Sequence, residues 1–357
     1  MLISLRDLNF LCGSFAASMD TTPYILAIES SCDDTSAAVL HGRKVLSNIV
    51  ASQEVHTVYG GVVPELASRA HQQNIVPVVD RALKVANITP QQLNAIAFTN
   101  GPGLMGSLLV GTSFSKSMAL ALDIPLIPVH HMHAHILAHL IEDAHEKEIQ
   151  FPFLCLTVSG GHTQLVLVKA PKEMEVLGET IDDAVGEAFD KAAKILGLPY
   201  PGGPHVDRLA QEGDPSFLTF GRSNVQGYDF SFSGMKTSFL YNLQKKVKED
   251  PDFVQNHLAD ICASYQKALL DVLFKKLDKA IKEFQISHVA IAGGVSANSG
   301  LRNRLIQLGQ RKKLNVYIPP FAYTTDNAAM IGISGYYNYL AKEQADMSIC
   351  AAAKVKF

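Results

Sequence analysis

The most constraining feature of the sequence is an internal repeat, in which two kinds of segment recur in the same order. Segments 23–40 (PYILAIESSCDDTSAAVL) and 152–169 (PFLCLTVSGGHTQLVLVK) each contain an apolar run, a short polar or glycine-rich turn and a second β-like run. This pattern predicts a β-hairpin in each segment. Such a repeat indicates a duplicated architecture, in which a loop of one half has a counterpart in the other.

A second pair of segments follows the same logic. The apolar run 95–98 (AIAF) leads into the turn 101–103 (GPG), and the run 289–292 (VAIA) leads into the turn 293–294 (GG). In each case a strand, a glycine turn and a helix-like pattern follow one another, which presents backbone amides at a helix N-terminus to an anion. The two pairs together predict two related α/β halves with a ligand in the cleft between them.

The length of 357 residues favours two domains, at roughly 150 residues each. We place the boundary in the charged stretch 142–150, just before a strand that Pro152 would begin. The predicted parts are an extension at 1–22, which we expect to be disordered, an N-terminal lobe at 23–148, a C-terminal lobe with helical insertions at 149–345 and a tail at 346–357. Apolar residues at three- and four-residue spacings predict helices at 64–84, 107–122, 183–196 and 257–284.

The composition excludes several classes of protein. Hydrophobic residues make up 47% of the chain and charged residues 18%, which is typical of a globular protein with a buried core. With 31 Lys and Arg against 34 Asp and Glu, the net charge of −3 gives no strong overall field toward nucleic acid or a membrane. A nucleic-acid partner would need a local basic patch, for which the candidates are Arg302, Arg304, Arg311, Lys312 and Lys313, and also Lys245, Lys246 and Lys248. Solvated helix faces are the alternative interpretation of these clusters.

Two features indicate a cytoplasmic protein. The five cysteines lie far apart with no CxxC pair, which fits a reducing compartment. No apolar run approaches the roughly 20 residues that span a bilayer, so we expect a soluble chain with no membrane partner. The best candidate, 107–129, is interrupted by Lys116 and Asp123.

Residues 130–139 (HHMHAHILAH) hold five of the 13 histidines of the chain. If this stretch is helical, His131, His135 and His139 share one face, so that a pair of imidazoles can bind one metal ion. Histidines that are solvated or hydrogen-bonded on an ordinary helix are the alternative. The HExxH motif of zinc peptidases does not fit this stretch, because it needs a glutamate directly after its first histidine. A third ligand has to come from elsewhere, and Asp326, in an expected turn before a helix, is a candidate.

Two turns of the repeat carry residues that could bind a substrate. The turn 158–163 (VSGGHT) has glycines that let the backbone approach a phosphate, although a plain tight turn would have them too. The corresponding turn of the first hairpin (ESSCDD) carries Asp33 and Asp34, and carboxylates there suit a metal, a base or an amine substrate. Asp190 and Asp207 lie on either side of a PGGP turn and could bracket a ribose, with ordinary surface carboxylates as the alternative.

Nine motifs in a fixed order carry a close resemblance to one known family. They read IESSCDDTSAAV, GGVVPELASRAH, GPGLMGSLLVG, HMHAH, VSGGHTQL, AFDKAAKILGLPYPGGP, FSFSGMKT, GGVSAN and TTDNAAMI. From Tyr24 to about Tyr339 the chain resembles the TsaD family of tRNA N6-adenosine threonylcarbamoyltransferases, earlier regarded as glycoproteases. The resemblance implies an α/β fold of the duplicated actin-like and sugar-kinase-like (ASKHA) type, with two lobes around a nucleotide cleft, which agrees with the repeat.

The same resemblance assigns site residues. His131, His135 and Asp326 match the family's metal ligands, which implies one divalent metal ion per subunit, Fe²⁺ in the first place with Zn²⁺ as the alternative. We expect Asp190 and Asn298 to come from opposite halves of the duplicated chain, so that a closed two-lobed cleft brings both to one adenosine. The residues that match the adenylate cleft are Thr157, Val158, Ser159, Gly160, Gly161, Asp190, Gly203, Asp207 and Asn298.

The sequence departs from the family pattern at two positions. His133 stands where relatives often have Glu, and on a helix it points away from the face of His131 and His135, so we expect a supporting or surface group there. Thr157 stands where archaeal relatives supply a Tyr as a further ligand, which implies a more open metal in this chain.

The implied activity is a group transfer to tRNA. The threonylcarbamoyl group moves from threonylcarbamoyl-AMP to the N6 amine of the adenosine 3′ of the anticodon, in tRNAs that read codons beginning with A. N6-threonylcarbamoyladenosine forms as AMP leaves, and Asp33 or Asp34 would position or deprotonate the amine. The implied partners are tRNA, threonylcarbamoyl-AMP and TsaB-like and TsaE-like proteins. A kinase of the same superfamily, a metal-dependent glycoprotease and a binding or scaffold protein stay open as alternatives.

Overall fold

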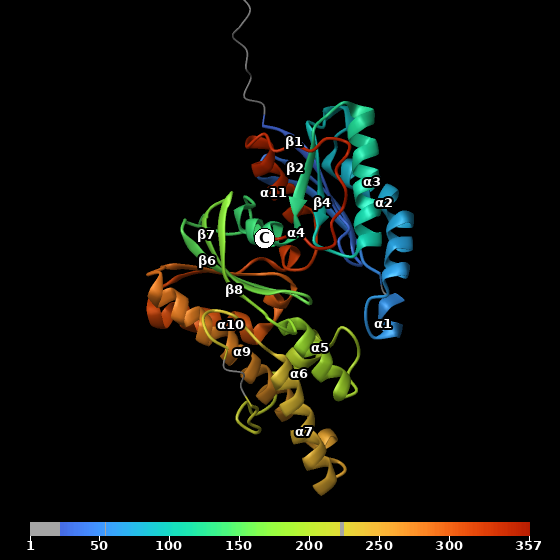
Figure 1. Ribbon diagram of the computed structural model, residues 1–357. Helices are drawn as coiled ribbons and strands as arrows, with labels where there is room; N and C mark the ends of the chain where they lie inside the picture. Colours follow the sequence, from blue (N-terminus) through green and yellow to red (C-terminus); the bar gives the residue numbers. More distant parts are fainter. Residues whose placement is uncertain (1–21, 54, 222–224) are drawn as a thin grey trace, which may run out of the picture.

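The structure, a computed structural model, describes residues 22–53, 55–221 and 225–357. The extension predicted at 1–22 lies outside the described residues apart from residue 22. Figure 1 shows two lobes, each built around one sheet. The first sheet has the order β3-β2-β1-β4-β5, with β1 (Tyr24–Glu29), β2 (Thr35–His41), β3 (Lys44–Ala51), β4 (Ala95–Gly101) and β5 (Leu126–His130). The second has the order β10-β9-β6-β7-β8, with β6 (Phe153–Val158), β7 (Thr163–Ala170), β8 (Glu173–Glu179), β9 (His288–Ala292) and β10 (Asn315–Tyr317).

The two sheets have the same topology, which confirms the repeat and the predicted ASKHA-type fold. β1 pairs antiparallel with β2 and in parallel with β4, and β6 pairs in the same way with β7 and β9. The two predicted hairpins are therefore β1–β2 and β6–β7, and the two predicted strand-to-glycine-turn segments are the ends of β4 and β9. Every residue of β6 is buried, as expected for an apolar strand with both faces covered.

Helices cover both sheets. In the first half they are α1 (Val55–Tyr59), α2 (Pro64–Ala86), α3 (Met105–Leu122) and α4 (His131–Leu137), with the 3-10 helices η1 (Pro90–Gln92) and η2 (Ala138–Leu140). They continue with α5 (Val185–Ile195), α6 (Gly202–Ala210), α7 (Ser233–Glu249), α8 (Phe253–Asn256), α9 (Leu258–Glu283), α10 (Ser299–Lys312) and α11 (Ala328–Leu340), and with η3 (Gly294–Ala297) and η4 (Phe321–Tyr323). The four helices predicted from apolar spacing are confirmed as α2, α3, α5 and α9.

Helices α4 and α11 lie where the two halves meet. One buried cluster joins Ile136 of α4 and Ile331 of α11 to Ala97 of the first sheet and Cys155 of the second. Although α11 follows the second half in the sequence, it packs on β1, β2 and β4 of the first sheet, on the face opposite α2 and α3 (Figure 1). The ends of the halves at 148 and 345 stay predictions.

The segment predicted as a tail, 346–357, returns to the first half. The backbone N–H of Ala352 donates to the carbonyl of Asn100 at 2.9 Å, and the N–H of Gly103 donates to the carbonyl of Ala353 at 3.2 Å. Figure 1 shows the C-terminal end beside α4. None of the described helices is long and apolar enough to cross a membrane.

Candidate active site

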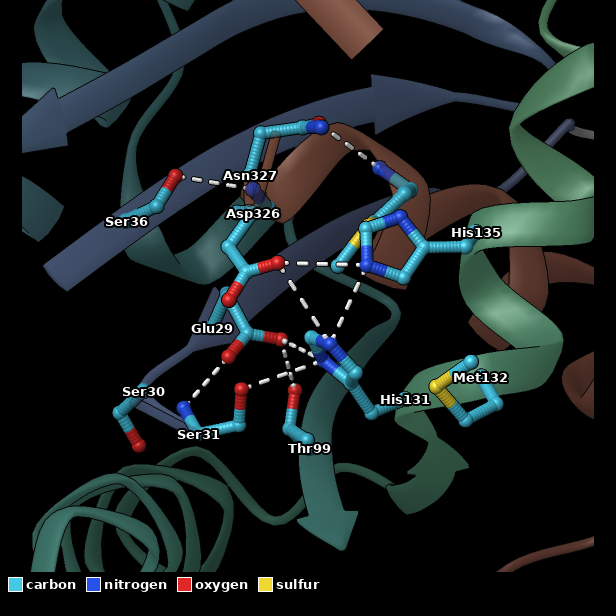
Figure 2. Close-up of polar contacts among 12 residues, drawn as sticks. Glu29, Ser30, Ser31, Ser36, Thr99, His131, Met132, His135, Asp326 and Asn327 are labelled. Atoms are coloured by element: carbon cyan, nitrogen blue, oxygen red, sulfur yellow. Dashed lines mark hydrogen bonds and ion pairs between the residues drawn. The ribbon is translucent and has the colours of Figure 1, made fainter. Parts of the chain in front are cut away.

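The side chains of His131, His135 and Asp326 converge at the junction of the halves (Figure 2). The two histidines lie one turn apart on α4, and their Nε2 atoms are 3.2 Å from each other. Asp326 comes from the turn before α11, and its Oδ1 lies 3.2 Å from Nε2 of His135 and 3.5 Å from Nε2 of His131. Asn327 begins α11 by accepting a hydrogen bond from the N–H of Met330, which fixes the turn. Two imidazoles and one carboxylate form a donor set that Fe²⁺ and Zn²⁺ both accept.

A fourth side chain, Glu29 at the end of β1, completes this cluster. It is fully buried, and its Oε2 lies 3.2 Å from Nδ1 of His131 and accepts a hydrogen bond from the Thr99 hydroxyl at 2.6 Å. The carboxylate can only accept, so Nδ1 of His131 carries a proton toward Glu29, and Nε2 is the nitrogen that faces Asp326 and would bind a metal ion after losing its own proton. Glu29 was not predicted as a site residue, although one signal for it is present in the sequence, a carboxylate at the end of a buried apolar strand.

The charged groups of this cluster shift one another's pKa values. Burial lowers the pKa of His131, but the carboxylates of Asp326 and Glu29 outweigh it and raise that pKa to about 9. Burial also disfavours the charged forms of Glu29 and Asp326, yet the facing imidazole of His131 holds the pKa of both carboxyls below the usual value. The cluster therefore sets two carboxylates against the imidazolium of His131, and this excess of negative charge favours a bound cation.

The other histidines of the run have different surroundings. The prediction that His139 shares the face of His131 and His135 is wrong, because α4 ends at Leu137 and the chain tightens into a 3-10 helix. Nε2 of His139 donates to the carbonyl of Ile291 at 3.0 Å, and its Nδ1 lies 2.7 Å from Nε2 of His145.

His133 points away from the cluster, as expected. Its ring lies 4.4 Å from that of Phe357, and burial lowers its pKa to about 3.

The turn that carries Asp33 and Asp34 is held from behind by α2 and α3. Nε2 of His71 donates to the carbonyl of Cys32 at 3.0 Å, and the hydroxyl of Ser107 donates to the same carbonyl at 2.9 Å. Burial raises the pKa of Asp34 to about 6, because the charged carboxylate loses its hydration. A carboxylate with such a pKa can take up a proton near neutral pH.

The two glycine turns of the second half touch each other. Gly293 has φ +85°, and a Cβ atom there would lie 2.4 Å from the carbonyl oxygen of Val158, so only glycine fits. A Cβ on Gly186, in the first turn of α5, would lie 2.5 Å from the carbonyl oxygen of Ser159. Gly160 is open on its outer side, with nothing within 4 Å of a Cβ built there, and so is the neighbouring Gly161. The turn therefore faces open space beside the start of a helix, which suits an anion.

Thr157 differs from the rest of this turn. It is fully buried in β6, and its hydroxyl donates to Sγ of Cys155 at 3.7 Å. Its side chain is therefore engaged within the core.

Asp190 and Asp207, two further residues predicted for the cleft, accept hydrogen bonds from backbone N–H groups. Oδ1 of Asp190 accepts hydrogen bonds from the N–H groups of Gly202 at 2.8 Å and Gly203 at 3.3 Å. Asp207 accepts from the N–H of Ser299 at 2.8 Å, at the start of α10.

Asn298 begins α10 by accepting from the N–H of Leu301 at 2.8 Å, and its Nδ2 donates to Oε1 of Gln266 at 2.7 Å. Gln266 in turn donates to Asp207 at 3.1 Å and so joins the two residues. Gln266 was missed, because nothing in the apolar pattern of α9 distinguishes it. The prediction that Asp190 and Asn298 come from opposite halves is wrong, because α5 and η3 both belong to the second half. Their contact with one adenosine stays a prediction.

Charges from both halves act on Tyr200. Burial raises its pKa to about 12, and the carboxylates of Asp190, from the second half, and Asp33, from the first, act in the same direction. The raised pKa keeps the Tyr200 hydroxyl protonated at neutral pH, so it can donate a hydrogen bond.

Comparison with known proteins finds close relatives over most of the chain. The family described as "TsaD: tRNA N6-adenosine threonylcarbamoyltransferase" matches residues 44–333. A protein of Christiangramia forsetii named tRNA N6-adenosine threonylcarbamoyltransferase is 62% identical over 333 residues, which cover 93% of this chain and 98% of that one. A protein of the same name from Porphyromonas gingivalis is 60% identical over 318 residues, or 88% of this chain and 93% of that one.

Solved structures share the fold at low sequence identity. HypF from T. kodakarensis superposes with a TM-score of 0.59 at 15% identity, over 92% of this chain and 49% of that one. Component A of the (R)-2-hydroxyglutaryl-CoA dehydratase of Acidaminococcus fermentans gives a TM-score of 0.50 at 14% identity, over 89% and 99%. At these identities the likeness concerns the fold alone. The sequence relatives decide the family, and the chain belongs to the TsaD family of tRNA N6-adenosine threonylcarbamoyltransferases.

Proposed function

We propose that the chain transfers the threonylcarbamoyl group of threonylcarbamoyl-AMP to the N6 amine of the adenosine 3′ of the anticodon, in tRNAs that read codons beginning with A. The observation that carries the proposal is the approach of three parts at the junction of the halves. The metal-type cluster of His131, His135 and Asp326 lies close enough to the acidic turn for Asp326 to act on the pKa of Asp34, and the glycine turn at 293–294 comes up to Thr325, next to Asp326. Membership of the family supports the reaction type. A kinase would have no use for the histidine cluster, and a zinc peptidase of the HExxH type would need a glutamate base on α4.

The glycine turns are the proposed site of the AMP moiety. The backbone amides of 159–161 and the first turn of α5 would hold the phosphate, because both offer N–H groups to an anion. Asp190 uses only Oδ1 for the backbone, so its second oxygen is left to accept a hydrogen bond from a ribose hydroxyl. Asp207 and Asn298 shape this side through the start of α10.

His131, His135 and Asp326 would hold one divalent metal ion, Fe²⁺ in the first place and Zn²⁺ as the alternative. Three convergent donor atoms and the buried carboxylate of Glu29 beside them support this assignment. When bound, the ion supplies a Lewis acid beside the carbonyl of the threonylcarbamoyl group. Glu29 fixes the tautomer of His131 for that purpose.

The acidic turn would act on the acceptor. As the N6–carbonyl bond forms and the bond from the carbonyl carbon to the AMP phosphate oxygen breaks, the N6 amine loses a proton, which Asp34 can take up. Asp33 and the hydroxyl of Tyr200 would orient the reactants. An aromatic amine is a weak nucleophile, so alignment beside the activated carbonyl contributes as much as the base.

We further propose that the chain works in the cytoplasm with tRNA and with TsaB-like and TsaE-like proteins. The part about tRNA is supported by the relatives of the chain, which are named as transferases that act on tRNA.

The decisive experiment supplies threonylcarbamoyl-AMP ready-made, with the partner proteins, an unmodified tRNA transcript and no ATP. We expect modified tRNA and one AMP released per transfer. Asp190→Ala should weaken binding of the adenylate by roughly tenfold to a hundredfold, since a carboxylate that binds ribose hydroxyls contributes about 1.5–3 kcal/mol. Lys194→Ala, on the exposed side of the same helix, is the control.

Three results would contradict the proposal. Transfer that requires ATP hydrolysis by this chain would favour a kinase. Cleavage of a glycoprotein without transfer would favour the peptidase. Equal adenylate affinity in the Asp190→Ala and Lys194→Ala variants would show that Asp190 does not bind the adenylate and that the proposed adenylate site is wrong.

A further inference from the structure

A groove of about 560 Å³ lies on the second lobe between α9 and α10, outside the residues of the candidate active site. Its lining includes Lys275 from α9 and Arg304, Gln307 and Arg311 from α10. Figure 1 shows the two helices side by side in the lower lobe. Arg304 and Arg311 belong to a basic cluster predicted from the sequence, and the proposed chemistry does not use it.

The region around the groove is strongly basic. Residues 267–313 hold ten of the chain's 31 Lys and Arg but only three of its 34 Asp and Glu. The net charge of the whole chain is −3, so this positive excess is local. Besides burial, the charges of Lys279 and Lys275 lower the pKa of Lys276, which shows that these ammonium groups repel one another. A polyanion would relieve that repulsion.

Two of the acidic residues fix the walls of the groove. Arg304 Nη1 pairs with Asp271 Oδ1 at 2.7 Å, and Lys312 Nζ pairs with Asp278 Oδ1 at 2.5 Å, so both pairs join α10 to α9. Other basic side chains are exposed and form no ion pair with a carboxylate of the described residues, namely Lys275, Lys279 and Arg311. These three charges are available to a partner.

The basic region begins at the candidate active site. α10 starts where Ser299 donates to Asp207, and its 14 residues span about 21 Å at 1.5 Å per residue. One turn along, the guanidinium of Arg302 lies 4.0 Å from the ring of Phe321, which is 67% exposed. An exposed aromatic ring with a guanidinium on one face is a platform on which an unpaired base can stack.

We propose that the groove between α9 and α10 binds the phosphate backbone of the tRNA substrate, with Lys275 and Arg311 on phosphates and Phe321 against an unpaired base. The inference rests on the proposed function, since the RNA in the groove is the one whose adenosine is modified in the cleft. Lys and Arg contacts to phosphates depend on charge and not on base sequence.

The test compares two variants of equal charge change. The groove variant carries Lys275→Gln and Arg311→Gln, and the control carries Arg81→Gln and Lys147→Gln, at two exposed basic residues outside the groove. The measured quantities are kcat and KM for an unmodified tRNA transcript at several salt concentrations, with the partner proteins and saturating threonylcarbamoyl-AMP. Binding of the adenylate alone is measured in parallel.

We expect the groove variant to raise KM for tRNA by roughly tenfold and to reduce the slope of log kcat/KM against log salt by about 1.5–2, because two phosphate contacts are lost. Its kcat at saturating tRNA and its affinity for the adenylate should equal those of the control. If the groove variant melts at a lower temperature than the control, Lys279→Gln with Lys313→Gln takes its place.

Equal KM and equal salt slope in groove variant and control would overturn the inference while leaving the proposed function intact. A defect that vanishes when the partner proteins are omitted, with direct tRNA binding unchanged, would also overturn it and would assign the groove to an acidic protein surface. Absence of transfer by the unaltered chain would instead overturn the proposed function, and the inference with it.

Discussion

Glu29 decides which nitrogen of His131 is protonated, and this single contact organises the metal-type cluster. The carboxylate is buried against the imidazole and is held in place by Thr99. Carboxylates of this kind stabilise the ligand geometry of histidines without touching the ion. At the residue scale the cluster therefore depends on Glu29 in addition to the three expected ligands His131, His135 and Asp326.

The first prediction concerns metal binding. His131→Ala and Asp326→Ala should each abolish retention of a divalent metal ion, and Glu29→Gln should weaken binding by roughly tenfold to a hundredfold because the His131 tautomer is no longer enforced. Metal per chain after dialysis, measured by elemental analysis, gives the answer. His133→Ala, on the same helix, is the control and should keep its metal. Full metal content in His131→Ala and Asp326→Ala would show that the cluster is not the ligand set.

The second prediction concerns the pH dependence at Asp34. Below about pH 4 its carboxyl is protonated in both states, and between about pH 4 and 6 only the unfolded chain loses the proton. The folded state therefore becomes less stable as the pH rises through that window. Asp34→Asn removes this cost, so the variant should be more stable by roughly 1–3 kcal/mol at pH 7.5 and equal near pH 4. Its transfer activity should fall.

Urea unfolding at both pH values measures the effect. A gain of the same size at pH 4 and pH 7.5 would mean that the ionisation of Asp34 is not its cause.

Helices α4 and α11 are short, but they position all three residues of the metal-type cluster, because they lie where the halves meet. α4 contributes both histidines, and α11 fixes the turn of Asp326. Close packing makes this possible, since a Cβ on Gly335 would lie 2.4 Å from Cβ of Ala97 on β4. At the scale of elements, the distance between α11 and the first sheet sets the position of the third ligand.

The third prediction tests this packing. Gly335→Val should destabilise the fold by about 1–3 kcal/mol, because the larger side chain pushes α11 away from β4. It should also lower metal affinity, since Asp326 moves with α11. The free energy of unfolding in urea and metal retention are the measurements. Gly234→Ala, where a Cβ meets nothing within 4 Å, is the control and should be nearly neutral. Similar values for the two variants would show that α11 has room to adjust.

The C-terminal segment of the chain packs on the first half, although it follows the second half in the sequence. Lys116 of α3 donates to the carbonyl of Ile349 at 2.8 Å, and Ala352 donates to Asn100. Phe357 then packs beside His133 on α4. At the scale of the molecule, these contacts support α4 from the side opposite its ligands.

The fourth prediction removes that support. Deletion of 350–357 should lower the melting temperature by about 2–5 °C, as expected for the loss of two backbone hydrogen bonds and two ring contacts. Lys356→Gln, an exposed position in the same segment, should leave the melting temperature unchanged. Calorimetry of the full chain and both variants gives the comparison. An unchanged melting temperature in the deletion would mean that the segment contributes no stability.

The sequence alone determined the features that depend on local periodicity. The hairpins, the strand-to-glycine-turn segments and α2, α3, α5 and α9 follow from the spacing of apolar residues. The common face of His131 and His135 follows from the helical repeat, because residues four apart lie over one another. These relations hold within one element, so they need no knowledge of the fold.

Only the tertiary structure decided which elements meet. Glu29 and Asp326 reach the histidines because β1 and α11 pack at the junction of the halves, and Gln266 reaches Asn298 because α9 lies beside α10. The end of α4 at Leu137, which separates His139 from the cluster, likewise comes with the contact of His139 to Ile291 in the other sheet. Contacts between elements distant in sequence arise from the packing of whole faces, and no spacing of residues along the chain encodes them.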